Sequence, residues 1–443
     1  MNIGHLLLAG GSLLLTAQSA HAAALMLYAW EDEEKHSGNR APVTFEPPLN
    51  SFTLLLPARH EEVVIQDTIQ RTVDLDYPRE LVQILVVIEA GDKGTITKVE
   101  EKLVTLRSQG IHNVKLITFP DPPINKPHGL NIGMEQATGD VVTIFDAEDE
   151  PHADILDVVN TDMIRNGAPV VQCGVQLMNY ADRWYSALNV LEYFFWFKSR
   201  MHYHASVGMV PLGGNTVFIR RDVLEEMHGW DQNCLTEDAD LGIRLSVAGV
   251  PIRVLYEDAH VTREETPHTV GQFIKQRTRW NQGFMQVLGK RQWMKLPTWQ
   301  QRLLAVYTLA FPFLQALTVL YVPISLWMIF TVEVPVLVAM ISALPGYMLI
   351  IQFLVSVVGL YEFTKAHQLR PSLFSPLKML VIYLPFQWML GYAAVRAVGR
   401  QIIGLNTWEK TQHVGAHRRQ PAAATSTART SIAFDPDKDA AHD

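Results

Sequence analysis

Long uncharged apolar stretches occur near both ends of the chain. Lys, Arg, Asp and Glu are all absent from residues 1–30, 303–332, 334–361 and 380–395. A helix that spans a bilayer takes about 20 apolar residues, so the first three stretches are long enough and the fourth is borderline. The pattern predicts an N-terminal transmembrane anchor over residues 1–30 and interfacial and transmembrane helices over residues 286–405.

The charges that flank these stretches indicate orientation only in part. Lys35 and Arg40 follow the first stretch and no positive charge precedes it, which places residue 40 onward in the cytosol. Ala20-His21-Ala22 resembles a signal-peptide cleavage site, but the uncharged start favours an uncleaved anchor. Basic residues lie on both sides of the last stretch, and the stretch from Leu303 is long enough for one tilted span or a hairpin. The number of C-terminal crossings is therefore open.

Between the apolar ends, short apolar runs alternate with amphipathic stretches. Residues 31–50 are charged and contain prolines, which is typical of a linker. The pattern then predicts strands at 52–56, 84–88, 114–119 and 141–145 and helices at 61–73, 96–107 and 128–137. This alternation predicts an α/β domain over residues 51–285, with a parallel, Rossmann-like sheet covered on both faces. Such sheets bind ligands at the carboxyl ends of their strands.

Composition narrows the function classes. The formal net charge is −8 and the pI is about 6.1. Nucleic-acid binding requires a basic surface, which this composition does not indicate, so no nucleic-acid partner is expected. Cys173 and Cys234 stand in no metal-binding or redox spacing and are expected to be buried thiols. Residues 406–443 end in a stretch rich in Ala, Thr, Ser and Asp and are expected to form a largely disordered C-terminal tail.

A cluster of acids follows the fourth predicted strand. Asp146, Glu148 and Asp149 come directly after VVTIF, so their carboxylates should project into the crevice at the strand ends. Such oxygen ligands suit a divalent metal, Mg²⁺ or Mn²⁺, which usually binds one or two carboxylates together with substrate phosphates. The alternative is a solvated turn or a helix N-cap.

Two further motifs lie near the end of the domain. Thr236-Glu237-Asp238 opens a predicted helix, where it serves either as a cap with an acidic first turn or as part of a reaction site. Gln276-Arg277-Thr278-Arg279-Trp280 places Gln276 and Arg279 on one helical face beside Trp280. This arrangement suits a diphosphate and a sugar, although amphipathic helices at membrane surfaces also carry Arg and Trp. The aromatic segment 183–204 is either a membrane-surface or channel-lining element or a buried core helix.

The order of these motifs resembles that of family 2 glycosyltransferases. Pro57-Ala58-Arg59-His60-Glu61-Glu62 follows the first strand, an acid follows the second and Asp-Ala-Glu-Asp follows the fourth. Thr-Glu-Asp and Gln-Arg-Thr-Arg-Trp then precede the C-terminal apolar stretches, as in the membrane-bound, cellulose-synthase-like branch of the family. The resemblance implies a GT-A, nucleotide-sugar-binding domain in the cytosol, within a multi-pass protein of the cell membrane.

On the donor side, the resemblance implies a role for each motif residue. The implied donor-binding set is Glu61, Glu89, Lys126, Asp146, Gln276, Arg279 and Trp280. The implied metal ligands are Asp146 and one of two acids, Glu148 or Asp149. The family's usual Asp after the second strand is Glu89 here, and its usual Asp-x-Asp is Asp146-x-Glu148 followed by Asp149. The sequence therefore does not decide which of the last two acids binds the metal.

On the acceptor side, the resemblance implies that Asp238 is the catalytic base, with Gly214, Glu237 and Trp280 nearby. In an inverting transfer the acceptor hydroxyl attacks the anomeric carbon, so one base is needed together with stabilisation of the leaving diphosphate. The helix dipole would keep Asp238 ionised, and a metal with Arg279 would stabilise the diphosphate. A growing polysaccharide is the expected acceptor and a single membrane lipid is the alternative. An inactive scaffold is disfavoured because the base and the Arg-Trp pair are both present.

Overall fold

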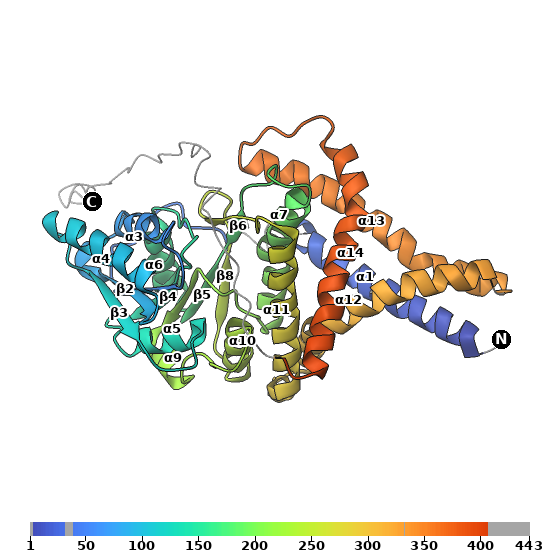
Figure 1. The fold of residues 1–443 in the computed structure, drawn as a ribbon, viewed down its shortest axis with the longest axis horizontal. Coiled ribbons are helices and arrows are strands. Elements are labelled where there is room, and N and C mark those ends of the chain that lie inside the picture. The colour runs from blue at the N-terminus through green and yellow to red at the C-terminus, as the bar shows by residue number, and fades with distance from the viewer. Residues whose placement is uncertain (1–2, 32–38, 332, 406–443) are drawn as a thin grey trace, which may run out of the picture.

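The computed structural model describes the backbone of residues 3–31, 39–331 and 333–405 (Figure 1). The predicted tail over residues 406–443 lies outside these residues, as does part of the predicted linker. Both therefore stay predictions.

The first half of the α/β domain follows the predicted alternation. In chain order it comprises β1 (Phe52–Ala58), α3 (Ile65–Val73), β2 (Val82–Glu89), α4 (Lys93–Ser108), β3 (Val114–Phe119), α5 (Lys126–Met134) and β4 (Val141–Ile144). β1 pairs in parallel with β2 and β4, and β2 pairs in parallel with β3. The prediction was wrong at the start of α3, because residues 61–64 form a turn in which the Val64 N–H donates to the Glu61 carbonyl.

The second half departs from the predicted parallel sheet. It comprises α6 (Ile155–Asn166), β5 (Val170–Cys173), β6 (Val175–Leu177), α7 (Ser186–Phe195), the π-helical turn η2 (Trp196–Arg200), α8 (Met201–Val207), β7 (Val217–Arg220), α9 (Arg221–Glu226), α10 (Glu237–Val247), β8 (Ile252–Leu255) and β9 (Thr262–Glu264). The sheet order is β3-β2-β1-β4-β7-β5-β8, and β7 runs antiparallel to both of its neighbours.

The antiparallel direction of β7 follows from the path of segment 174–216. A parallel strand needs a crossover that returns the chain to the amino edge of the sheet. Segment 174–216 instead begins and ends at the carboxyl edge, where Gln172 and Val217 are paired. The expectation of a purely parallel sheet was therefore wrong at this strand.

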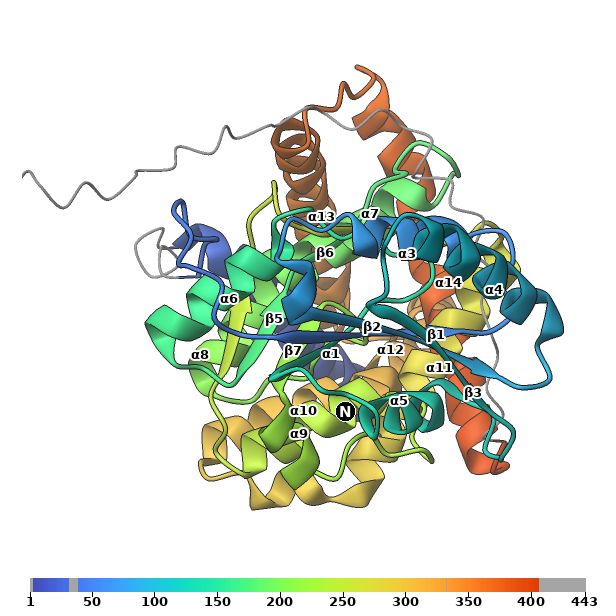
Figure 2. The same ribbon diagram turned by 90° about the vertical axis from the view of Figure 1, so that its left-hand side faces the viewer.

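Two apolar layers cover the two faces of the sheet. Leu54 and Leu56 of β1 face the layer that contains α3, α4 and α6, whereas Leu55 faces α5, α10 and η2 (Figure 2). All three leucines are fully buried. Burying one leucine contributes about 1.5–3 kcal/mol, so alternate residues of this central strand stabilise both layers.

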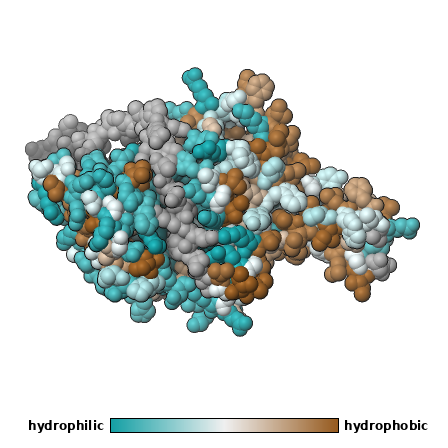
Figure 3. Space-filling model, viewed as in Figure 1, coloured by the Kyte–Doolittle hydropathy of each residue, from teal (hydrophilic) through white to brown (hydrophobic). Residues whose placement is uncertain are grey.

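Among the described residues, four helices are long and apolar enough to cross a bilayer. They are α1 (Ile3–Glu31), α12 (Trp299–Thr331), α13 (Val336–Ala366) and α14 (Ser375–Ile402). The stretch from Leu303 is thus one helix rather than a hairpin, and the borderline last stretch lies inside a longer helix. Figure 3 shows hydrophobic residues gathered on the surface of these helices and hydrophilic residues on the α/β domain.

Helices α7 and α11 (Val270–Lys290) stand between the sheet and the four apolar helices (Figure 1). α11 packs against α12 and α14, and α7 packs against α13. At the contact between α7 and α13, a Cβ on Gly359 would collide with the Phe195 ring, so glycine permits this close approach. The α/β domain and the apolar helices therefore share a continuous packed boundary, and the site lies along it.

Candidate active site

One cavity of about 620 Å³ contains nearly all of the predicted site. It begins at the carboxyl ends of β1, β2 and β4 and continues past α7 and α11 to the apolar helices. Its walls include the predicted residues Glu61, Glu89, Lys126, Asp146, Glu148, Gly214, Glu237, Asp238, Gln276, Arg279 and Trp280. Asp149 is the one member of the predicted set that does not line it.

Lys126 and Asp146 form an ion pair in the cavity wall. Lys126 begins α5, whose N-terminus is capped by Asn125 through a hydrogen bond from the His128 N–H. The Lys126 Nζ lies 2.7 Å from Asp146 Oδ2 and also donates to the Gly214 carbonyl at 3.0 Å. Burial would lower the pKa of Lys126, but Asp146 and other nearby acids raise it above its usual range, so the ammonium stays charged.

Asp149 is buried beneath the loop that follows β4 and does not face the cavity. It is 0 % exposed, and its carboxylate accepts hydrogen bonds from the Asp146 N–H at 2.7 Å and from the Asn215 amide at 2.8 and 2.9 Å. Burial, together with the charge of Glu264, raises the pKa of Asp149 well above its usual value. Of the two acids that the sequence could not separate, Glu148 is therefore the one in the cavity wall.

Glu264 is a residue that the sequence reasoning missed. It ends β9, lines the cavity, and accepts a hydrogen bond from the same Asn215 amide at 2.5 Å. Burial and the charge of Glu148 raise its pKa to about 7. Its sequence signal is weak because β9 has only three residues and no apolar pattern.

The Thr-Glu-Asp motif opens α10, as predicted, and is held against α11. A Cβ on Gly283 of α11 would collide with the Thr236 side chain, so the two elements touch directly. Lys290, at the end of α11, strengthens this contact through ion pairs with Asp231 at 2.5 Å and Asp240 at 2.6 Å. The motif is thereby fixed beside Gln276 and Arg279.

The two acids of this motif differ in exposure. Glu237 is 4 % exposed, whereas Asp238 is only partly buried and its Oδ2 lies near Gly214, where an added Cβ would approach it to 3.3 Å. Burial and the charge of Asp238 raise the pKa of Glu237 to about 7, and burial also raises the pKa of Asp238. The expected effect of the helix N-terminus is present in the bond from the Ala239 N–H to Asp238, but burial outweighs it.

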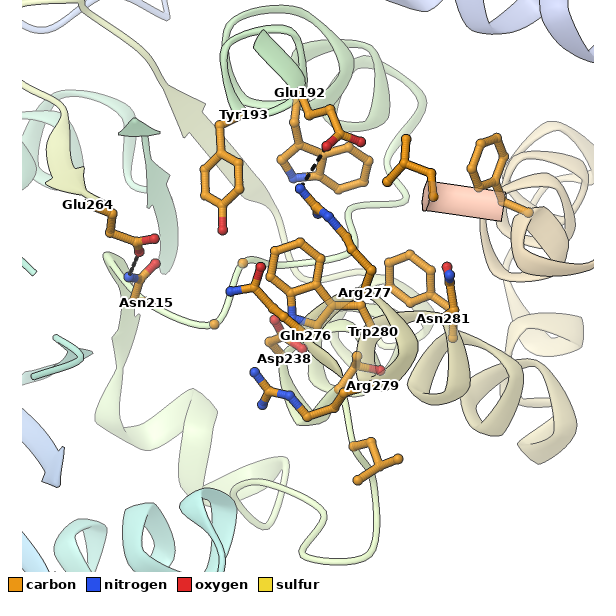
Figure 4. A pocket seen from close by; sticks show the side chains of 18 of the residues that line it. Glu192, Tyr193, Asn215, Asp238, Glu264, Gln276, Arg277, Arg279, Trp280 and Asn281 are labelled. Atoms are coloured by element: carbon orange, nitrogen blue, oxygen red, sulfur yellow. Dashed lines mark hydrogen bonds and ion pairs between the residues drawn. The ribbon is translucent and has the colours of Figure 1, made fainter. Parts of the chain in front are cut away.

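Side chains of α11 form the wall opposite Asn215 and Glu264 (Figure 4). Gln276 and Arg279 lie together beside Asp238, which agrees with their predicted common face. Tyr193 of α7 lies above them, and its ring centroid is 6.2 Å from that of Trp280. Tyr193 lines the cavity, whereas its neighbour Phe194 is fully buried. The segment 183–204 thus contributes both to the cavity wall and to the core.

Arg277 holds Trp280 in place. Its guanidinium lies 4.4 Å from the centroid of Trp280 and 5.0 Å from that of Phe273. It also pairs with Glu192 of α7 at 2.8 Å (Figure 4) and donates a hydrogen bond to Asn189. Arg277 therefore positions α11 against α7, a role that its place in the motif did not indicate.

Cys173 and Cys234 are free and buried, as expected. Burial is the main cause that raises the pKa of both thiols, Cys234 to about 12, so neither is a ready nucleophile.

Comparison with known proteins identifies the domain. The family model described as "Glycosyltransferase like family 2" matches residues 47–283, more than half of the chain. The chain belongs to the family 2 glycosyltransferases. The predicted GT-A fold is confirmed as well, because a solved mannosyltransferase of Pyrobaculum calidifontis, in complex with GDP-Man and Mn²⁺, superposes over 90 % of this chain and 99 % of its own with a TM-score of 0.54 at 19 % identity.

Curated relatives of this glycosyltransferase align over part of their length. The probable glycosyltransferase YdaM of Bacillus subtilis is 29 % identical over 55 % of this chain and 57 % of its own. The β-monoglucosyldiacylglycerol synthase of Synechocystis is 27 % identical over 53 % and 48 %. The poly-β-1,6-N-acetyl-D-glucosamine synthase of Staphylococcus epidermidis is 24 % identical over 62 % and 63 %. The chain thus spans about half to two-thirds of the length of these relatives.

Proposed function

We propose that this glycosyltransferase transfers a sugar with inversion from a nucleotide-sugar donor to an acceptor at the membrane. A growing polysaccharide is the first candidate for the acceptor, and a single membrane lipid is the alternative. The observation that carries the proposal is the continuous cavity, which holds the family motifs at one end and lies against the apolar helices at the other. The names of two relatives support the two candidates, since one makes a polysaccharide and the other a glycolipid.

We propose Asp238 as the catalytic base. It is the acid of the Thr-Glu-Asp motif that is more open to the cavity, and burial raises its pKa towards the range in which a carboxylate accepts a proton efficiently. The acceptor oxygen would form a bond to the anomeric carbon while the bond from that carbon to the diphosphate breaks. The hydroxyl proton would pass to Asp238, and the diphosphate would leave with the electron pair.

The acids after β4 fit a divalent metal, Mg²⁺ or Mn²⁺. Asp146 and Glu148 both line the cavity and offer hard oxygen atoms, which these ions prefer. When bound, such an ion would stabilise the negative charge that develops on the leaving diphosphate. Lys126 and Arg279 would bind the same phosphates from the protein side, and Glu61 and Glu89 would lie near the nucleoside.

We further propose that the four apolar helices cross the cell membrane and that the α/β domain faces the cytosol. Lys35 and Arg40 follow the first apolar helix in the sequence, as the positive-inside rule requires for this orientation.

The base assignment is tested with Asp238→Asn and Glu237→Gln in the purified full chain. Release of the nucleotide diphosphate is first measured with a panel of nucleotide sugars, and the product is sized to separate a polymer from a single transfer. Loss of a general base costs about 100- to 10,000-fold in rate, so Asp238→Asn should bind donor normally and transfer almost nothing. Glu237→Gln should be milder. If Asp238→Asn keeps more than about a tenth of the rate, the base must be sought elsewhere, and Glu237 would be the first candidate.

A further inference from the structure

Arg200 carries a charge in the part of the cavity that lies against the apolar helices. It ends the π-helical turn η2 and lines the same cavity as Asp238. Its neighbour Ser199 donates a hydrogen bond to the Leu25 carbonyl of α1 at 2.8 Å. The candidate span in α1 ends at Tyr28, three residues further on, which is about 4.5 Å along a helix. If α1 crosses the bilayer as proposed, Arg200 lies near the end of the span and thus near the depth of the lipid headgroups.

The charge of Arg200 is not neutralised by a direct partner. Among the residues that the structure describes, none forms an ion pair with its guanidinium, and its Nε is buried without a hydrogen bond. The two groups that favour its charge are Tyr307 and Glu192, and Glu192 is already paired with Arg277. Burial lowers the pKa of Arg200, which means that its surroundings disfavour the positive charge. Arg200 as a whole is partly buried, and a charge withdrawn from water in this way is normally paired.

The cavity around Arg200 is suited to a polar headgroup rather than to acyl chains alone. Polar side chains of three apolar helices line it, namely Gln18 and Ser19 of α1, Gln315 of α12 and Gln352 of α13. Gln352 also donates to the Ser19 carbonyl at 2.9 Å, which ties α13 to α1. Polar and ionisable groups between apolar helices mark ligand sites by default.

We infer that Arg200 binds the phosphate of a lipid acceptor that carries both a phosphate and a free hydroxyl. Arginine is the side chain best suited to a phosphate, since its planar fork donates two parallel hydrogen bonds. The inference rests on the proposed function and narrows its acceptor to a phosphate-bearing lipid, or to a chain that grows on one. The phosphate itself is unchanged, because the hydroxyl oxygen attacks the anomeric carbon and its proton passes to Asp238.

The test compares two lipids that both present hydroxyls but differ in the phosphate. The purified full chain is placed in phosphatidylcholine nanodiscs that contain either phosphatidylglycerol or diacylglycerol, and retained lipid is measured by native mass spectrometry after release. The variants are Arg200→Gln and Arg200→Lys. Lys198→Gln is the matched control, because Lys198 lies in the same turn but pairs with Asp258 and does not line the cavity.

The wild type should retain at least tenfold more phosphatidylglycerol than diacylglycerol, and Arg200→Gln should lose this preference. Loss of a charge-assisted hydrogen bond corresponds to about 10- to 100-fold in affinity. Arg200→Lys should keep part of the preference and Lys198→Gln all of it. Equal retention of the two lipids by the wild type, or an unchanged preference in Arg200→Gln, would overturn the inference. Competition by soluble glycerol phosphate as strong as that by the lipid would assign the site to a free phosphate and overturn it too.

Donor hydrolysis in the same samples separates this inference from the proposed function. The control Lys198→Gln should release nucleotide diphosphate from the donor, with water as acceptor, at a rate within about twofold of the wild type. If no nucleotide sugar is turned over by the wild type while the lipid preference holds, the proposed function fails and the phosphate site stands. If turnover is normal and the lipid preference is absent, the proposed function stands and the phosphate site is overturned.

Discussion

Replacing Arg277 by methionine should misplace Trp280 without removing any group that touches the donor phosphates. Arg277 is 11 % exposed and Glu192 is 34 % exposed towards the cavity, so their ion pair is partly screened. A hydrogen bond to a charged group contributes about 1.5–3 kcal/mol, and this exposure places the pair near the lower value. The contact of the guanidinium with Trp280 adds about 0.5–1 kcal/mol.

We therefore expect Arg277→Met to weaken the contact between α7 and α11 by about 2–2.5 kcal/mol in total. The cost is limited because Glu192 can take up a proton once its partner is gone; burial already raises its pKa, and Arg277 now opposes that rise. If half of the loss appears in the transition state, kcat/KM for the donor falls about five- to eightfold, since 1.4 kcal/mol is a factor of ten.

A double-mutant cycle with Glu192→Gln measures the pair. Initial rates of nucleotide diphosphate release are determined for the wild type, Arg277→Met, Glu192→Gln and the double variant, each in the full chain. The double variant should have a kcat/KM no lower than that of Arg277→Met, because it leaves no unpaired carboxylate. The coupling free energy between the two residues should be about 1–2 kcal/mol. Additive effects within about 0.5 kcal/mol, or full activity in Arg277→Met, would refute the reasoning.

Three further outcomes are expected. Glu148→Gln should raise the Mn²⁺ concentration needed for half-maximal rate at least tenfold. Asp149→Asn should lower thermal stability and leave this concentration within about threefold of the wild-type value. The opposite pattern would make Asp149 the metal ligand. Because burial raises the pKa of Asp238, the acidic limb of the pH–rate profile should lie at higher pH than for an ordinary aspartate, with the transfer rate falling as Asp238 takes up a proton. Glu237→Gln should move this limb of a pH–rate profile to lower pH, and an unmoved limb would argue against the coupling. A cysteine placed at the exposed Ser108 should resist impermeant thiol reagents in intact cells, and strong labelling from outside would overturn the cytosolic orientation.

Most residues of the proposed donor side could be singled out from the sequence, because the acidic motifs lie next to strand or helix ends and Gln276 and Arg279 share one helical face. Asp146 follows β4 and Asp238 opens α10, as the alternation and the capping signals indicated, whereas Lys126 begins α5 two residues before the predicted helix start at residue 128. Strand ends of a twisted sheet converge on one edge, so residues at these ends meet even though they are far apart in the chain. The structure places all of them in one cavity.

The choice between Glu148 and Asp149 could not be made from the sequence. It depends on Asn215, which is 66 residues from Asp149 in the sequence and 49 residues from Glu264. Adjacent acids have similar local signals, and only a distant amide decides which of them is buried and hydrogen-bonded. Glu264 was missed for the same reason, since nothing near it in the sequence marks a site.

The sequence by itself determined the features that depend on neighbours along the chain: the apolar helices, the strand and helix alternation, and the motif residues at the element ends. The tertiary structure alone decided the direction of β7, the burial of Asp149, the stacking of Arg277 on Trp280 and the position of Arg200 beside α1. Periodicity and capping arise from backbone geometry within a few residues, and a single sequence records them directly. The charge balance of a cavity is set by side chains from many separate elements, so it becomes visible only when the fold brings them together.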